Sequence, residues 1–276
     1  MEHMNDPLWL AGLAAAMAVT GLLSGTLAGL LGVGGGIVIV PVLFLLFPVL
    51  GVPEAIQMKL AVGTSLATII PTSIQSARKH RARGTMDVPL LKKLWPSILV
   101  GVVIGTLLAI IVRGPVMSAV FAAVALLVAA NMGLSGHEFR LRNSFPGEPG
   151  RSLLGILIGT VSAMMGIGGG TVGVPILSMY GAPIRAAVAT ASVFGVIISI
   201  PATLGLIYAG LGDPQLPPYS LGYVNLVGFA LIVPSSMLAT PWGVHLAHTI
   251  PPVVLKRGFA AFLAITATRM IWKLLA

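Results

Sequence analysis

Two short glycine clusters are the residues in this sequence best suited to bind a small anion. The first cluster is residues 32–36 (Gly-Val-Gly-Gly-Gly), with Pro41 five residues later, and the second is residues 166–170 (Gly-Ile-Gly-Gly-Gly), with Pro175. Consecutive glycines and a nearby proline interrupt a helix, because they raise its entropy cost and remove a hydrogen-bond donor. The helix that restarts after such a break presents free amides and a positive dipole end, which attract an anion without any charged side chain.

The consecutive glycines are the predicted backbone ligands, and hydroxyl groups on the following segments are candidate side-chain donors. The predicted binding residues are Gly34, Gly35, Gly36, Thr64, Ser65, Gly168, Gly169, Gly170 and Ser192. The hydroxyls have an alternative role, because serine and threonine in membrane helices often bond to their own backbone. A cavity is also expected, since unwound backbone inside a membrane is tolerated only where protein or water satisfies it.

The glycines have two other interpretations. A dinucleotide-binding loop requires a preceding strand in a soluble βαβ unit, which this sequence does not offer. Close packing of membrane helices is the second, because Gly21, Gly25, Gly29 and Gly32 recur at helical spacing. We expect packing for these spaced glycines and binding for the triplets, since packing alone does not need three adjacent glycines.

Side chains for catalysis or metal binding are missing from the apolar segments. All 7 Asp and Glu residues lie in loops or at segment ends, which argues against a carboxylate proton relay or cation site. The absence of cysteine excludes thiolate catalysis and iron–sulfur clusters. His245 and His248 could share a metal, but no nearby acidic residue completes a site. We therefore expect no enzyme activity, no catalytic residue, no metal and no cofactor.

The composition is that of a membrane protein. Of 276 residues, 57% are hydrophobic and 8% are charged, and about 20 consecutive apolar residues suffice to cross a bilayer as a helix. The net charge of +9 is spread over short loops, which favours cytoplasmic loops over a nucleic-acid surface. Residues 1–7 carry no Lys or Arg, so we expect the first helix to be retained rather than cleaved as a signal peptide.

The glycine clusters belong to an internal repeat. Residues 21–43 match residues 155–177 at 12 of 23 positions, with a constant offset of 134. The sequence therefore predicts a first transmembrane repeat at residues 1–134, a polar linker at residues 135–151 and a second repeat at residues 152–276.

Apolar runs predict five helical elements in each half. They cover residues 8–31, 37–50, 56–77, 90–112 and 115–134, then residues 152–165, 171–180, 184–209, 221–240 and 254–275. The predicted fold class is an all-α polytopic membrane protein with two homologous halves, 8–10 transmembrane elements and glycine-rich interrupted helices.

The basic residues favour halves of opposite orientation. If each interrupted segment returns to the side it came from, 12 of the 16 Lys and Arg residues lie on the cytoplasmic side. If each segment crosses once, giving eight spans and parallel halves, the count is 11. Because positively charged loops are retained in the cytoplasm, inverted repeats are favoured. The eight-span alternative stays open.

At these motifs the chain resembles the TauE/SafE family of membrane permeases, also called sulfite exporters. Members carry a duplicated half with a G-x-G-G-G-x-x-x-x-P segment, which residues 32–41 and 166–175 match. Residues 63–65 (Gly-Thr-Ser) resemble that family's G-T-S element, and residues 190–192 (Thr-Ala-Ser) are the counterpart in the second half. Aligning Pro71 with Pro201 shifts this last pairing by three residues. The resemblance covers nearly the whole chain.

The resemblance implies transport of sulfite, a sulfonate or a related anion such as sulfoacetate, outward across a bacterial inner membrane. The partners would then be the small anion and the lipid bilayer, with alternating access around the two glycine breaks. Two alternatives are a transporter of another small anion and a non-transporting membrane scaffold, although a scaffold has no use for two matched helix breaks. The sequence does not indicate an oligomeric state.

Overall fold

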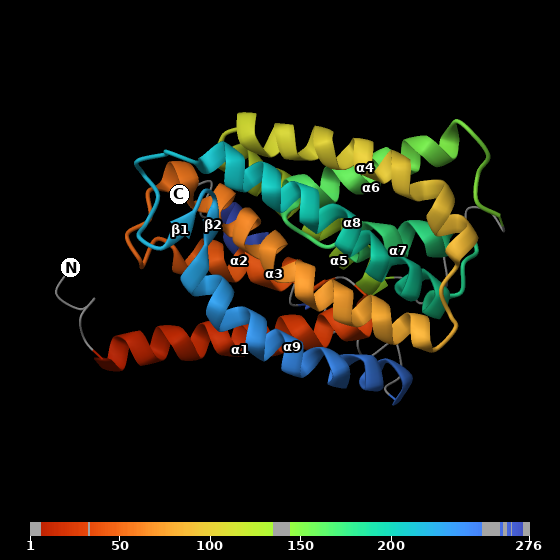
Figure 1. The fold of residues 1–276 in the computed structure, drawn as a ribbon, viewed down its shortest axis with the longest axis horizontal. Helices are drawn as coiled ribbons and strands as arrows, with labels where there is room; N and C mark the ends of the chain where they lie inside the picture. Colours follow the sequence, from red (N-terminus) through yellow and green to blue (C-terminus); the bar gives the residue numbers. More distant parts are fainter. Residues whose placement is uncertain are drawn as a thin grey trace.

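The computed structural model describes residues 7–32, 34–134, 144–249, 260–261, 264–265 and 267–272. Val33, residues 135–143 of the predicted linker and most of the predicted helix at residues 254–275 lie outside the described residues. The described part is almost entirely helical, which confirms the all-α prediction (Figure 1). The division of the chain at residues 134 and 152 stays a prediction.

Each predicted helix break is found at its glycine cluster. The elements before residue 135 are α1 (Pro7–Leu31), α2 (Gly36–Leu46), α3 (Glu54–Ala82), α4 (Val88–Ile111) and α5 (Gly114–Leu134). Those after residue 149 are α6 (Gly150–Met165), α7 (Gly170–Met179), α8 (Ile184–Gly210), β1 (Ser220–Leu221), β2 (Val224–Asn225) and α9 (Leu226–Thr249). The strands pair antiparallel, with Ser220 opposite Asn225.

Several element boundaries differ from the sequence prediction, since α2 ends at Leu46 rather than at residue 50 and α9 extends to Thr249 rather than to residue 240. Helix α3 continues beyond its predicted end at residue 77 and includes the basic residues Lys79 and Arg81, because cations are favourable in a last helical turn. Helix α9 starts at Leu226 rather than near residue 221. The Asn225 side chain accepts a hydrogen bond from the Gly228 amide at 2.7 Å and caps α9, while the preceding residues turn back at Gly222, whose φ is 53°.

The structure has the features of an integral membrane protein. Four described segments are long and apolar enough to cross a membrane: Ala11–Leu30, Val88–Ile111, Ile184–Gly210 and Leu226–Leu246. Their outer surfaces expose large apolar side chains such as Val103, Leu107 and Leu204, as expected against lipid. Helices α2 and α7 have 11 and 10 residues, and at 1.5 Å per residue neither reaches across a core of about 30 Å.

Helices of one half pack against helices of the other half. Helix α1 packs along α9, α6 packs along α4, and α3 packs against α8 (Figure 1). A Cβ atom added at Gly21 or Gly25 would collide with α9, and one at the equivalent Gly155 or Gly159 would collide with α4. Gly29 lies equally close to α9. These contacts confirm that the spaced glycines serve close helix packing.

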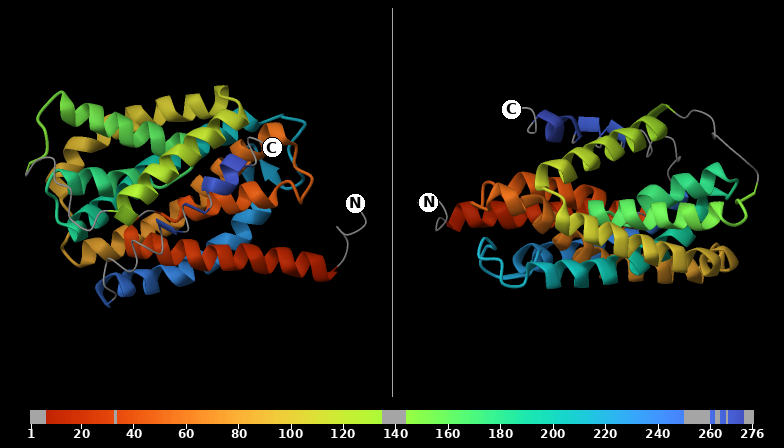
Figure 2. Two further views of the ribbon diagram at one scale, coloured as in Figure 1. Left: turned by 180° about the vertical axis from the view of Figure 1, so that it is seen from behind. Right: turned by 90° about the horizontal axis from the view of Figure 1, so that it is seen from above.

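The first helix of each half starts from a different end of the molecule. Helix α1 begins at one end of the long axis and α6 at the other (Figures 1 and 2). The α2–α3 connection and the β-hairpin lie toward the end where α1 begins, and the α3–α4 turn lies toward the end where α6 begins. This arrangement is compatible with inverted halves, and both the inversion and the orientation relative to a membrane stay predictions.

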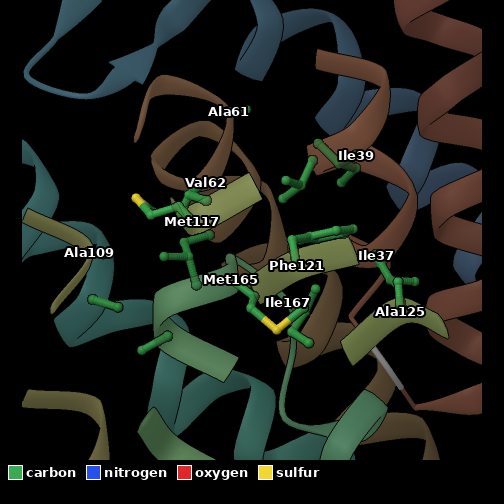
Figure 3. Packing of buried hydrophobic residues seen from close by; sticks show 14 of the residues in the cluster. Ile37, Ile39, Ala61, Val62, Ala109, Met117, Phe121, Ala125, Met165 and Ile167 are labelled. Carbon is green, nitrogen blue, oxygen red and sulfur yellow. The ribbon is translucent and has the colours of Figure 1, made fainter. Parts of the chain in front are cut away.

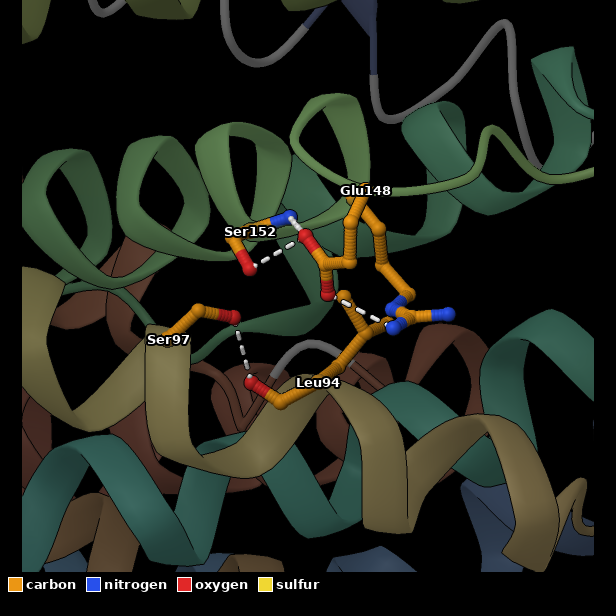
Figure 4. Close-up of polar contacts among 5 residues, drawn as sticks. Leu94, Ser97, Glu148 and Ser152 are labelled. Carbon is orange, nitrogen blue, oxygen red and sulfur yellow. Dashed lines mark hydrogen bonds and ion pairs between the residues drawn. The ribbon is translucent and has the colours of Figure 1, made fainter.

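Glu148 stabilises the start of α6 through hydrogen bonds. Its carboxylate accepts hydrogen bonds from the Ser152 hydroxyl and amide at 2.6 and 3.3 Å, and pairs with Arg151 at 2.6 Å (Figure 4). The Ser152 hydroxyl, with Arg151 as a weaker contributor, lowers the pKa of Glu148 from its usual value. Nearby, Ser97 of α4 donates to the Leu94 carbonyl, so its hydroxyl is satisfied where α6 packs against it.

Inversion can be tested with single cysteines, because the chain has none of its own. We expect cysteines replacing the exposed Arg81 and Ser144 to react with an impermeant thiol reagent from one side, and those replacing Arg113 and Tyr219 from the other. The measurement is labelling in intact cells against inverted vesicles. Labelling of position 219 together with 81, and opposite to 113, would establish eight spans with parallel halves instead.

Candidate anion site

The two glycine clusters lie against each other in the interior; we call this contact the glycine junction. A Cβ atom added at Gly34 would lie 3.4 Å from the Cα of Gly168, and one added at Gly36 would collide with the Gly166 carbonyl oxygen. Gly34 and Gly168 are equivalent positions under the 134-residue offset, so the same point of each repeat meets its counterpart. All described glycines of both clusters are buried.

Glycine is required at the junction for two different reasons. Gly34 and Gly35 have φ angles of 74° and 79°, and Gly166 has 68°, in the left-handed region that side chains disfavour. Gly169 instead has a right-handed φ of −55°. There the limit is space, because an added Cβ would lie 2.5 Å from the Cβ of Phe194.

Two helix amino termini converge at the glycine junction. Helix α2 begins at Gly36 and α7 at Gly170, and the amides of a first helical turn have no partner inside their own helix. Both termini carry the positive end of a helix dipole. Where the sequence predicts a cavity, the structure brings the two breaks into direct contact, so the junction must widen to admit an anion.

Residues next to the glycines of both clusters belong to the apolar core. Ile37 from the first turn of α2 and Ile167 from the second glycine cluster pack near Val62, Met165 and Phe121 (Figure 3). All five side chains are almost completely buried. Such surroundings exclude water and strengthen the attraction between the helix termini and a bound charge.

Of the three predicted side-chain donors, Ser65 is the one that contacts a glycine cluster. Its hydroxyl donates to the Gly166 carbonyl at 2.7 Å, which ties α3 to the second break. The Thr64 hydroxyl accepts a hydrogen bond from the Asn225 amide at 2.8 Å and holds the β-hairpin. The Ser192 hydroxyl donates to Ala189 of its own helix at 2.7 Å.

The structure also decides which residue of α8 corresponds to Ser65. Helices α3 and α8 each follow a glycine of positive φ, Gly51 (71°) and Gly181 (86°), and a proline two residues later. These residues and the internal prolines Pro71 and Pro201 are all offset by 130. Ser65 therefore corresponds to Gly195 rather than to Ser192.

Two buried hydroxyls beside the junction were not singled out as binding residues from the sequence. Ser73 Oγ and Thr171 Oγ1 have no hydrogen-bond partner among the described residues. Thr171 directly follows the second glycine triplet, and Ser73 lies eight residues after Ser65, within the same broad helix face. These spacings were the available signals, but they do not reveal which hydroxyls remain unpaired.

The β-hairpin packs against α3 next to Thr64. Tyr223 donates its hydroxyl proton to Asp213 at 2.9 Å, and its ring lies 5.7 Å from Lys59 Nζ, within cation–π range. Burial, followed by the Asp213 contact, raises the pKa of Tyr223 to about 12. Lys59 also donates to the Ile110 carbonyl at 2.7 Å. The hairpin is thereby fixed to α3 and, through Lys59, to the end of α4.

An open cavity of about 470 Å³ lies elsewhere and is lined by Leu45, Thr268, Arg269 and Trp272. Arg269 makes it a competing place for an anion. The Arg269 and Trp272 side chains are exposed, and solvent screening weakens a single exposed charge. No group of three metal-binding side chains occurs in the part of the chain that the structure describes.

Known proteins resemble the chain over nearly its whole length. The family model for the sulfite exporter TauE/SafE matches residues 17–270. A probable membrane transporter protein of Haemophilus influenzae is 36% identical over 255 residues, which cover 92% of this chain and 97% of the relative. One of Methanocaldococcus jannaschii is 26% identical over 263 residues, covering 92% and 94%. No solved structure matches the chain.

Close contact at the junction predicts a stability penalty for any added side chain. Gly36→Ala places a methyl group against the Gly166 carbonyl, and such overpacking costs about 1–3 kcal/mol. Gly12→Ala is the matched control, because an added Cβ there meets no atom within 4 Å. We expect thermal unfolding in detergent to show a lower Tm for Gly36→Ala alone. Equal Tm values for both variants would contradict the close contact.

Proposed function

The chain belongs to the sulfite exporter TauE/SafE family of membrane transporters, and on this premise we propose that it exports a small organosulfur anion such as sulfite, a sulfonate or sulfoacetate. The observation that carries the proposal is the convergence of the α2 and α7 amino termini at the buried glycine junction. Two positive helix ends in an apolar setting favour a small anion.

The distribution of acidic residues supports an anionic substrate. In the described residues, Glu54 and Asp87 lie at the starts of α3 and α4, and Glu148 and Asp213 lie in connections. None of these carboxylates is in the glycine clusters or in the middle of a helix. The junction therefore lacks the intramembrane carboxylates that cation and proton transporters use.

The proposed ligands are backbone amides of the two triplets, Gly34 to Gly36 and Gly168 to Gly170. The Ser65 hydroxyl can turn from the Gly166 carbonyl to the anion without leaving the junction. Thr64 and Ser192 can contribute only after releasing the Asn225 amide and the Ala189 carbonyl. No catalytic residue and no cofactor takes part in this proposal.

Alternating access follows from inverted halves around one central site. The closed junction corresponds to a state in which neither end has access, and separation of the two breaks would open the site to one end at a time. We propose an outward direction, which the description of the family as a sulfite exporter supports, and a bacterial inner membrane, which the resemblance to that family implies. A carrier for another small anion is the main alternative.

Counterflow in proteoliposomes tests the substrate class without knowledge of the driving force. Vesicles loaded with unlabelled sulfite should accumulate radiolabelled sulfite, and external sulfoacetate should compete, because both present sulfur-bound oxygens to the amides. Phosphate and acetate serve as competitors of other chemistry, and protein-free vesicles give the background. Competition by phosphate or acetate alone would overturn the organosulfur assignment, and counterflow of none of these anions would overturn anion transport.

A further inference from the structure

Ser73 of α3 is a buried serine whose hydroxyl has no partner in the described parts of the chain. Its residue is 1% exposed, and no described group accepts from or donates to its Oγ. Buried polar atoms are nearly always hydrogen-bonded, because losing water without a replacement is unfavourable. Among the described residues, the Ser73 hydroxyl therefore keeps an unused donor that a ligand can take up.

The Ser73 hydroxyl lies beside the contact between the two glycine clusters. A Cβ atom added at Gly34 would lie 3.1 Å from Ser73 Oγ, and the same added atom would lie 3.4 Å from Gly168. On the other side, a Cβ added at Gly195 of α8 would collide with the hydroxyl. Backbone of both halves thus borders this one oxygen, and the hydroxyl fits there only because Gly195 has no side chain.

Neighbouring hydroxyls of α3 behave differently. Thr68 donates to the Ser65 carbonyl at 2.7 Å, and Thr72 donates to the Thr68 carbonyl at 3.1 Å. Such bonds to the preceding turn are the ordinary fate of hydroxyls in membrane helices. Ser73 does not use this option. Its counterpart under the 130-residue offset, Thr203 of α8, is also buried and without a partner among the described residues.

We propose that Ser73 is the primary side-chain donor to the transported oxyanion, with its hydroxyl bonded to one sulfur-bound oxygen beside the amides of the glycine junction. This assignment rests on the proposed function and deepens it. A hydroxyl bonds more strongly to a charged acceptor than to a neutral one. Being neutral, it also adds no opposite charge that would hold the anion too tightly for release.

The test is equilibrium binding of radiolabelled sulfite to purified protein, with Ser73→Ala compared to Ser118→Ala. Ser118 is equally buried, but its hydroxyl donates to the Gly114 carbonyl of its own helix at 3.1 Å. We expect Ser73→Ala to raise the Kd about tenfold or more, the usual effect of losing a hydrogen bond to a charged group. Its Tm should not fall, since only an unpaired polar atom is removed. Ser118→Ala should bind as the wild type does.

A second variant, at Gly195, keeps the Ser73 hydroxyl but fills the position that this hydroxyl occupies. Gly195→Ala places a methyl group against Ser73 Oγ and should also weaken sulfite binding. If the wild type binds sulfite and Ser73→Ala binds equally well, the Ser73 assignment is overturned while the proposed function stands. A lower Tm accompanying the loss of binding would assign Ser73 to packing and also overturn it. If the wild type binds neither sulfite nor sulfoacetate, both proposals are overturned.

Discussion

Lipid offers no hydrogen bond to the backbone of a helix that stops inside a membrane, so each broken helix must be satisfied by protein or by a ligand. At the second break, part of this requirement is met by hydrogen bonds to neighbouring residues. Ser65 donates to the Gly166 carbonyl, and the Ile167 amide donates to the Ser162 carbonyl at 3.1 Å. Some amides at the starts of α2 and α7 are also paired locally, since Val38 donates to the Gly35 carbonyl at 3.1 Å and Thr171 to the Gly168 carbonyl at 3.2 Å. In the proposed function, the amides of the two glycine triplets bind the anion.

Glycine has a second use in this fold, which is to let the halves interlock. The first helix of each half packs on a helix of the other half, α1 on α9 and α6 on α4, through glycines pressed against backbone. Small residues at such interfaces let the helix backbones approach closely. The glycines along the helices therefore serve packing between the halves, and a role of either set of glycines in a transport cycle stays a proposal.

Much of the fold is predictable because a long apolar run in lipid can adopt few backbone structures other than a helix. The helices, both breaks and the packing role of Gly21 and Gly25 follow from hydrophobicity and glycine spacing. The β-hairpin does not, because two-residue strands carry no periodic pattern. The side-chain donors were only partly predictable, since Ser65, Ser192 and Ser73 are all serines within apolar helical segments. Which of them bonds to a carbonyl depends on the backbone that tertiary packing brings within reach.

The location of a bound anion tests the central claim most directly. Selenite has the shape and charge of sulfite and scatters X-rays anomalously, so its position in crystals of the protein can be observed without assumptions about binding residues. The account predicts an anomalous peak between the starts of α2 and α7, with selenite oxygens about 3 Å from the amide nitrogens of the two glycine clusters. A peak beside Arg269 in the cavity lined by Leu45 and Trp272, with none at the glycine junction, would contradict it.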